Sequence, residues 1–536
     1  MPSRVLAGGF IVTVAVMFGW GTESGSAGDL AGDRHFDETQ GTTLFAFDES
    51  SIPFTQNLKL EMREPQRHPA NPVVKRGEPG KPDSWAVQFY GSILRENGKL
   101  RMWYVAAGDD RLDSTAAPSS PWRVAYAESN DGVTWTKPDL GLVEYAGDKN
   151  NNLVLMQPHI GTLNVKVIHD PDDPDPSRRY KMGCHVWFQK NDVRLGSFAP
   201  YGSPDGYTWK LLSDAKPEKS QLREEDLVIP ALHFEPVGGL YKWDGLFYLS
   251  GQNAIVHSRP YHGRVTRGFV SPDFVNWSQA SAVGFVRTPQ HTLLGPGRSL
   301  EGEQTHEGIA VWNRGNVLLG VSGLWHGAKE WPNITIDLGF VYSNDGVQFR
   351  EPLHEHTFLK RGEDGQWDQG GLLQAQGFEN IGEQTFVYYG TWDPRHWQGS
   401  PRRGGVGIAV LPRDRFADLV VDETTQGKSN YQMSEIDCEF LTASIPLKNP
   451  ADPKFYVNAD GLGDAAALRI ELLDHRMQPL PGYSGDDAAI VRTSGFQTPI
   501  VWKAARTAKL PERIRFKVTF EGKQRTAARF SAIYLN

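Results

Sequence analysis

Short runs in which apolar and polar residues alternate fill most of the chain between residues 85 and 415. Clear examples are GKLRMWYVAA at 98–107, DGLFYLSG at 244–251 and EQTFVYYGTW at 383–392. Alternation with a period of two is typical of half-buried strands, and glycine-containing turns separate the runs. The pattern predicts an all-β fold.

One heptapeptide recurs between these runs. SNDGVTW stands at 129–135, SPDGYTW at 203–209, SPDFVNW at 271–277 and SNDGVQF at 343–349, and LPRDRF at 411–416 is a degenerate copy. The aspartates of successive copies are 74, 68, 72 and 69 residues apart. A fixed period with strands in between indicates a repeat architecture. Four strands precede or flank each copy, so the spacing predicts a five-bladed β-propeller over residues 55–428.

The heptapeptide itself has the composition of a turn. Gly132 can adopt a positive φ, and Asp131 can accept hydrogen bonds from the amides of the turn. We expect it to connect the third and fourth strands of each blade, with the repeated aspartates in a structural role. In an antiparallel meander the loops between the second and third strands then lie on the opposite face, where we expect the chemistry.

Residues outside the propeller have a different texture at each end. Arg4, an apolar run at 5–20 and small residues at 25–27 predict a signal peptide over 1–27, with an uncleaved anchor as the alternative. A linker at 28–54 follows. The six or so strand-like runs after residue 428 predict a C-terminal β-sandwich over 429–536, with a structural or a carbohydrate-binding role. The mature chain is expected to be secreted or periplasmic, without a membrane span.

Composition narrows the partners. The net charge is −8 and charges of both signs are interspersed, so we expect no nucleic-acid binding. The only cysteines, Cys184 and Cys438, fall in different predicted modules; we expect them unpaired, and a disulfide is the alternative. No Cys/His spacing suggests zinc. We expect no cofactor, and a structural Ca²⁺ at the propeller axis is left open, as is the oligomeric state.

The loops on the face opposite the repeat are rich in aromatic and charged residues, as in GLWHGAKEWPN at 323–333 and GTWDPRHWQGSPRRG at 390–404. Aromatic rings that stack on sugar faces, beside charged groups that bind hydroxyls, suit a polyhydroxylated ligand. The alternative is that these tryptophans only pack the loops down. The predicted substrate-binding residues here are Trp325, His326, Trp392, Asp393, Arg395, His396 and Trp397.

Candidate catalytic carboxylates lie at the entrances of the innermost strands. Glu235 stands between Phe234 and Pro236, and a poorly solvated carboxyl group keeps its proton, as a general acid requires. The run EGEQTHEG at 301–308 brings further acidic groups and a histidine to the same level. The other acidic candidates are Asp83 upstream of the first blade and Glu303 and Glu307 in the fourth. The second blade offers Asn164 and the fifth Gln374, both uncharged, and we predict that Asn164 and His306 bind substrate.

RHPANPVV at 67–74 and EPVGGLYKWDGLFYL at 235–249 resemble segments of the five-bladed propeller glycoside hydrolases, the group of families 32, 43, 68, 117 and 130. The resemblance implies cleavage of glycosidic bonds by paired carboxylates, with Glu235 as general acid and Asp83 as nucleophile or base. In the second blade the family has an aspartate where this chain has Asn164 or Lys166. Glu307 is then the alternative second carboxylate, with His306 in a binding or charge-tuning role.

The resulting prediction is an exported glycoside hydrolase that acts on an oligo- or polysaccharide. The first alternative is a propeller that binds glycan without cleaving it, and the second is a structural or protein-binding propeller. The sugar, the linkage, the endo or exo mode and the stereochemical outcome are left undetermined.

Overall fold

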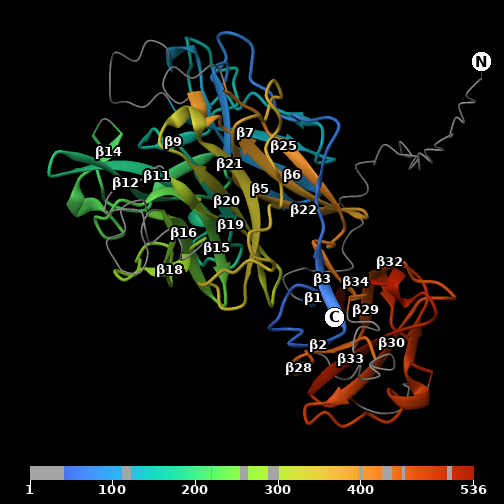
Figure 1. Ribbon diagram of the computed structural model, residues 1–536. Coiled ribbons are helices and arrows are strands. Elements are labelled where there is room, and N and C mark those ends of the chain that lie inside the picture. Colours follow the sequence, from blue (N-terminus) through green and yellow to red (C-terminus); the bar gives the residue numbers. More distant parts are fainter. Residues whose placement is uncertain are drawn as a thin grey trace, which may run out of the picture.

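The computed structural model describes residues 41–111, 122–218, 220–253, 264–287, 301–396, 403–424, 437–448, 453–503 and 510–535. This part of the chain consists of β-strands, loops and single-turn 3-10 helices, which confirms the all-β prediction (Figure 1). No helix within those ranges is long and apolar enough to cross a membrane. The predicted signal peptide, 1–27, lies outside the described residues.

The larger part of the molecule is a series of antiparallel meanders in sequence order. The first contains β5 (Ala86–Glu96), β6 (Lys99–Ala107), β7 (Arg123–Ser129) and β8 (Trp135–Thr136). The second contains β10 (Val165–His169), β11 (Tyr180–Lys190), β12 (Val193–Ser203) and β13 (Thr208–Leu211), with β9 (Leu155–Gln157) and β14 (Gln221–Leu222) at its edges. The third contains β15 (Glu235–Trp243), β16 (Leu246–Asn253), β17 (Val265–Ser271) and β18 (Ala282–Phe285).

The fourth meander contains β19 (Gly302–Asn313), β20 (Leu318–Gly327) and β21 (Thr335–Ser343), and the fifth contains β22 (Leu372–Ile381), β23 (Gln384–Thr391) and β25 (Gly407–Pro412). The outer edge of the fifth is completed by β4 (Gln66–Arg67), a strand from the other end of this part of the chain. Short elements in the connecting loops are η1 (Asp109–Arg111), η2 (Pro176–Arg178), η3 (Glu224–Asp226), η5 (Trp331–Asn333), η6 (Pro394–His396) and β24 (Arg403–Gly404).

The first strands of the five meanders form a closed ring. In the order β5, β10, β15, β19 and β22 each contacts the next, and β22 contacts β5. Regular pairing with the second strand is interrupted in four of these inner strands, between Gln88 and Ser92, Glu235 and Gly239, His306 and Ile309, and Gln374 and Phe378. Such bulges re-aim side chains and often lie beside active sites.

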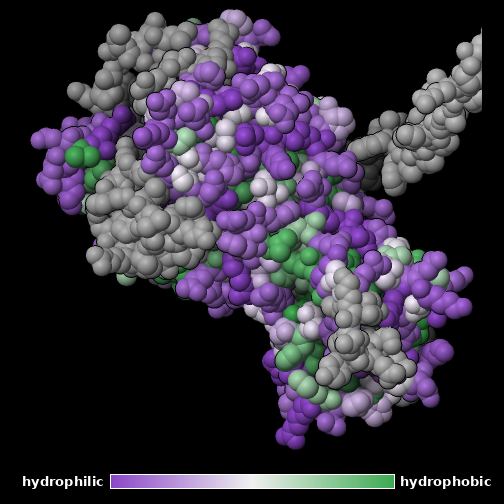
Figure 2. All heavy atoms as spheres, in the orientation of Figure 1, coloured by the Kyte–Doolittle hydropathy of each residue, from purple (hydrophilic) through white to green (hydrophobic). Residues whose placement is uncertain are grey.

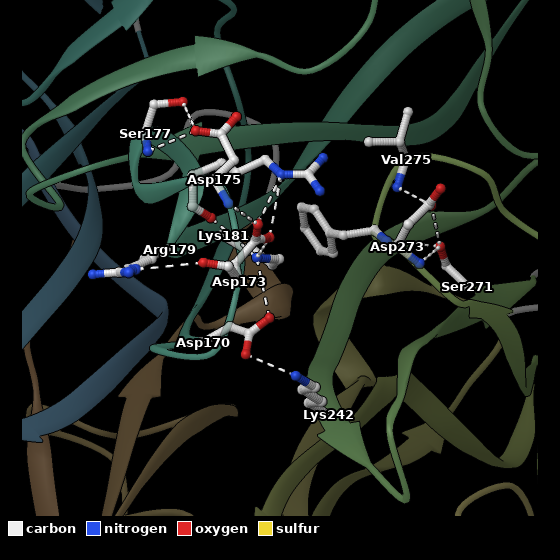
Figure 3. Close-up of polar contacts among 12 residues, drawn as sticks. Asp170, Asp173, Asp175, Ser177, Arg179, Lys181, Lys242, Ser271, Asp273 and Val275 are labelled. Carbon is white, nitrogen blue, oxygen red and sulfur yellow. Dashed lines mark hydrogen bonds and ion pairs between the residues drawn. The ribbon is translucent and has the colours of Figure 1, made fainter.

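The recurring heptapeptide forms the turn after the third strand of its meander, as predicted. The amides of Val133 and Thr134 donate to Oδ1 of Asp131 at 2.8 and 2.7 Å. Equivalent bonds bind Asp205, Asp345 and Asp273, and Figure 3 shows Asp273 with Ser271 and the amide of Val275. These bonds confirm the structural role of the repeated aspartate.

The variants Asp131→Ala and Asp205→Ala are each expected to lower the free energy of unfolding by about 1–2 kcal/mol, since each leaves turn amides without their acceptor. The two turns lie in different meanders, so the losses should add in the double variant. Denaturant titrations of the single and double variants measure this. A normally folded Asp131→Ala protein without the activity of the wild type would contradict the structural assignment.

A buried ion network braces the loop between β10 and β11 (Figure 3). The ammonium group of Lys181 lies 2.6 Å from Asp173 and 3.3 Å from Asp170, and Lys242 from the next meander lies 2.7 Å from Asp170. The acidic run of this loop is therefore neutralised by lysines of two meanders, which ties the second meander to the third.

The smaller part of the molecule has two sheets around one apolar core. One sheet has the order β3 (Leu58–Met62), β26 (Ala417–Val421), β34 (Arg529–Leu535), β29 (Phe455–Asp460) and β32 (Gly495–Pro499), with β1 (Thr42–Phe45) also on β34. The other has the order β2 (Phe54–Gln56), β27 (Glu439–Leu441), β33 (Arg513–Glu521), β30 (Ala467–Asp474) and β31 (Ala489–Val491), with β28 (Ile445–Pro446) on β33. Single turns η8 (Gly485–Asp487) and η9 (Arg525–Ala527) complete it.

These pairings differ from the expected boundaries at 54/55 and 428/429. Strands β1, β2 and β3 come from the N-terminal side, and β26 was expected in the propeller, yet all four pair within the sheets of the C-terminal strands. Figure 1 shows the blue N-terminal strands beside the red C-terminal ones. The smaller part is thus built from both ends of the chain. Cys184 and Cys438 are buried in different cores and form no disulfide with each other.

The two parts share an apolar and ionic junction. Phe45 and Tyr534 of the smaller part belong to the same core cluster as Phe416. Arg314 makes a bidentate ion pair with Asp414, the aspartate of the degenerate fifth repeat, and the hydroxyl of Tyr534 donates to Asp414 at 2.9 Å. Figure 2 shows a largely hydrophilic surface on this face, with hydrophobic residues gathered on the smaller part and at the junction.

A chain that ends near residue 428 is therefore expected to lose soluble expression or unfold at least about 10 °C below the full chain, because β1 and β26 would lose their partner strand β34, and β2 would lose β27. Thermal unfolding of the truncated and full chains measures this. A truncated chain that melts like the full one would show that the two parts fold independently.

Candidate active site

The bulge at Glu307 on β19 contacts the inner strands on both sides of it, β15 and β22. Glu307 has φ +68° and Gly308 has φ +81°, a conformation that non-glycine residues adopt rarely. The amide of Glu307 donates to the side-chain oxygen of Gln252 on β16 at 3.1 Å. A Cβ atom on Gly238 would stand 2.1 Å from the carbonyl oxygen of Glu307, so only glycine lets β15 approach this closely. Backbone strain of this kind is concentrated at functional sites.

The side chain of Glu307 is held by a histidine. Its Oε1 lies 3.1 Å from Nε2 of His306, and the two side chains are 13% and 2% exposed. Burial first, and then the charge of Arg264, holds the pKa of His306 well below its usual value, so the imidazole is neutral. A carboxylate can only accept, which assigns the single ring proton to Nε2. Nδ1 then accepts from the hydroxyl of Tyr90 at 3.5 Å.

Two tryptophans enclose the His306 ring. Trp325 and Trp392 stack on it with ring centroids 5.4 and 5.9 Å away and interplanar angles of 25° and 20°. The guanidinium of Arg264 lies 3.8 Å from the centroid of Trp325. Trp325 is fully buried and Trp392 partly, so in the described residues Trp325 packs His306 in place instead of presenting a face to ligand.

A lysine lies beneath this group. Lys166 is fully buried, and its Nζ donates to the carbonyl oxygens of Tyr90, Gly91 and Gln374 at 3.1, 3.3 and 3.4 Å. Burial lowers the pKa of Lys166 to about 7, against the opposing effect of the Glu307 charge. The side-chain amide of Gln374 donates to the carbonyls of His306 and Gly308, on both sides of Glu307.

Asn164 directly precedes β10, the strand that carries Lys166. Its amide nitrogen donates to the carbonyl of Val237 at 3.1 Å, which joins β10 to β15. The side-chain oxygens of Asn164 and Gln374 are buried without a partner among the described residues. Buried acceptors of this kind are satisfied by water or by hydroxyl groups of a ligand.

Glu235 is described by its main chain alone. It is the first residue of β15 and pairs in register with Gln252 of β16. Because the side chain of Gln252 binds the amide of Glu307, the main chains of Glu235 and Glu307 approach one glutamine from two strands. The backbone thus brings the predicted general acid next to the bulge.

In the described part of the chain, Asp83 contacts residues of the first meander and not the group around Glu307. Its carboxylate accepts from the hydroxyl of Tyr104 at 2.8 Å and forms an ion pair with Lys137, both from the first meander. The side chain is buried upstream of β5, and the positive charge of Lys137 balances its negative charge. Contrary to the expectation for a second catalytic carboxylate, these contacts do not join Asp83 to the group around Glu307.

A second histidine, His326, lies in a chain of alternating charges on the fourth meander. Its Nδ1 is 2.8 Å from Glu303 and its Nε2 is 3.0 Å from Asp337, while Arg287 pairs with Glu303 and Arg361 with Asp337. Burial lowers the pKa of His326, but hydrogen bonds to Asp337 and Glu303 and their charges outweigh it and raise the pKa to about 9. His326 is therefore an imidazolium at neutral pH.

This row of alternating charges around His326 predicts that the free energy of unfolding falls at alkaline pH. The folded-state pKa of His326 lies above the unfolded value of 6.5, so its stabilisation is complete below pH 6.5 and is lost as the pH rises through about 9. We expect the charge of His326 to contribute about 2 kcal/mol to the free energy of unfolding, a value already lowered to allow for the partial exposure of Glu303. Unfolding free energies of wild type and His326→Asn at pH 6 and pH 10 measure it: the two proteins should differ more at pH 6. An equal difference at both pH values would contradict it.

The remaining predicted binding residues brace a loop. Asp393 and Arg395 form a two-pronged ion pair with both distances 2.8 Å, and Arg395 also pairs with Asp364 at 2.8 Å. His396 is exposed, with Nε2 3.9 Å from Asp393. Trp397 lies outside the described residues. Sequence reasoning placed all of these on the ligand face, and the contacts show that Asp393 and Arg395 also hold the loop together.

No group of three or more His, Cys, Asp or Glu residues in the described ranges could hold a metal ion. The residues brought together are Tyr90, Asn164, Lys166, His306, Glu307, Trp325, Gln374 and Trp392. Sequence reasoning did not assign a role to Tyr90, which follows Phe89 in an apolar strand. Lys166 was noticed only by position, although a lysine in the run VKVI is the signal that could have marked it.

No protein-family model and no curated protein matches the chain. Solved structures do match. A member of GH130, a family of mannoside phosphorylases that contains glycoside hydrolases targeting β-1,2 mannosidic linkages in Candida mannan, is 14% identical over 66% of this chain and 95% of its own, with a TM-score of 0.42. An N-acetylgalactosamine deacetylase from F. plautii, solved with blood group B trisaccharide, is 15% identical over 67% and 96%, with a TM-score of 0.41.

A glycosyl hydrolase from Bacteroides ovatus is 15% identical over 66% of this chain and 95% of its own, with a TM-score of 0.41. These neighbours are glycoside hydrolases or other glycan-active enzymes. At such identities and TM-scores the likeness does not assign an activity to this chain, so a function has to be argued from its own residues.

Proposed function

We propose that this chain is a glycoside hydrolase whose centre lies in the funnel of a five-bladed β-propeller, with a β-sandwich attached. The closed ring of five inner strands and the completion of the fifth meander by β4 support the propeller. The two sheets around one core support the sandwich. The observation that carries the function is Glu307, a largely buried carboxylate in a strained bulge, bound to a neutral histidine at the centre of the ring.

The roles follow from the chemistry of glycosidic cleavage, which needs a proton donor and a second carboxylate. Glu235 protonates the leaving oxygen. Glu307 attacks the anomeric carbon or activates a water molecule. His306 donates its Nε2 proton to Glu307 and orients it, and Tyr90 fixes the tautomer from the other side of the ring. The substrate is an oligo- or polysaccharide that enters between the loop carrying Trp392 and the end of β20 at His326. Export is directed by residues 1–27.

The experiment is a screen of plant and algal oligosaccharides for released reducing sugar, with the wild type and Glu307→Gln side by side. Turnover by the wild type that the variant lacks supports the proposal. Turnover retained by Glu307→Gln would overturn the assignment of the centre.

A second candidate is a propeller that binds glycan without cleaving it. The observation in its favour is the pairing of Asp83 with Lys137, together with Lys166 and Asn164 in the second meander, which leaves fewer carboxylates at the centre than the resemblance implies. Binding of an oligosaccharide without turnover, measured by calorimetry, would favour this candidate.

A further inference from the structure

The ammonium group of Lys166 lies in a cage of main-chain carbonyls. An ammonium group has three hydrogens to donate, and three carbonyl oxygens accept at 3.1–3.4 Å. Tyr90 and Gly91 lie in the bulge of β5, where carbonyls are released from pairing with β6, and Gln374 lies at the edge of the bulge of β22. The bulges of two inner strands therefore supply the acceptors, and the third strand, β10, supplies the cation.

Another fully buried lysine in the described part of the chain, Lys181, has a different environment. Lys181 is equally buried, but two carboxylates neutralise it, Asp173 at 2.6 Å and Asp170 at 3.3 Å. Lys166 instead has neutral dipoles as its direct acceptors. Carbonyl cages of this kind hold monovalent cations such as K⁺, because several oxygens replace the hydration shell without adding charge.

We propose that the centre of the ring is a binding site for a monovalent, ammonium-like cation, and that the chain fills this site with its own Lys166. The tethered ion links β10 to β5 and β22. Its acceptors Tyr90 and Gln374 also contact His306 and the Glu307 bulge. The cation therefore holds in place the main chain of the two residues that position His306 and Glu307. The charged group that faces it is Glu307; His306 is neutral and Tyr90, Asn164 and Gln374 carry no charge. This inference does not depend on the proposed hydrolase activity.

The test is chemical replacement of the side chain in the full chain. Lys166→Ala removes the cation and leaves its space, and we expect the apparent Tm to fall by about 5 °C or more, since three buried carbonyls lose their donor. Methylammonium chloride should restore at least half of this loss, and tetramethylammonium chloride at the same ionic strength should not, because it is too large and donates no hydrogen bond. Lys166→Met, which fills the space without a charge, should stay low in both salts.

Three results would overturn the proposal. They are an unchanged Tm for Lys166→Ala, a lowered Tm that methylammonium does not restore, and an equal effect of methylammonium on the wild type or on Lys166→Met. If Lys166→Ala does not fold, the wild type labelled with ε-¹³C lysine supplies the test: one lysine signal should titrate with a midpoint near 7, well below the ordinary 10.5. A Lys166 signal that still has the chemical shift of a neutral amine at pH 5 would overturn the cage, because the cage requires the charged form.

Discussion

The variant Glu307→Gln is expected to lower turnover of a glycoside substrate by about 10⁴-fold or more, because the amide can neither attack the anomeric carbon nor take a proton from water. The fold should be kept, since glutamine has the same shape and can still accept the hydrogen bond from His306. Rates of reducing-sugar release by wild type and variant, with thermal unfolding of both, measure the effect.

The matched control is Glu379→Gln. Glu379 lies on another inner strand, β22, and its side chain is 12% exposed against 13% for Glu307, but it pairs with Arg95. We expect its loss to lower stability and to leave turnover within about twofold, because its carboxylate pairs with Arg95 near the end of β5 and it lies five residues beyond Gln374 on β22. Equal losses of turnover in the two variants would mean that Glu307 acts through the fold and not at the substrate.

The variant Glu235→Gln should lower hydrolysis of natural oligosaccharides by about 10²–10⁴-fold, the usual contribution of general acid catalysis. Glutamine keeps the size of the side chain and a hydrogen-bonding group but has no proton to transfer to the leaving oxygen. An activated aryl glycoside, whose leaving group needs no protonation, should be affected much less. The comparison of the two substrates in the same variant separates proton donation from binding.

Wild-type rates on both substrates in Glu235→Gln would remove Glu235 from the mechanism. The pair of carboxylates would then have to come from the fourth meander, where Glu303 lies four residues before Glu307 on the same strand. Glu303→Gln, which also removes the negative charge beside His326, distinguishes this arrangement.

The features that could be predicted from the sequence are those that depend on local chemistry. A serine, an aspartate and, in three of the four copies, a glycine within one heptapeptide satisfy their own turn by hydrogen bonds two or three residues along the chain, as at Asp131. The turn could therefore be predicted at each of these four copies, and the strands between the copies could be predicted from the alternation of apolar and polar residues. In the fifth copy Asp414 instead binds Arg314 and Tyr534, which are distant in sequence, so its contacts could not be predicted from the heptapeptide.

The features that could not be predicted depend on long-range pairing. Nothing local in residues 42–62 indicates that they join strands from the far end of the chain, because an edge strand has the same alternation whichever sheet it enters. Asp83 was expected at the centre because of its place before an inner strand, but Lys137, which follows another strand, binds it. The role of Lys166 depends on carbonyls that bulges release from strand pairing, and the positions of these bulges could not be predicted from the side chains.

The pairing of β1 with β34 sets an order of events for a newly made chain. More than 400 residues separate the two strands, so residues 42–45 leave the ribosome long before their partner at 529–535 exists. At ordinary rates of synthesis this interval is on the order of tens of seconds to a minute. During it, the N-terminal strands present open edges that can pair with another chain. A holdase chaperone that binds these edges until the C-terminus emerges would be a natural requirement for producing this protein, and expression yields should respond to its supply.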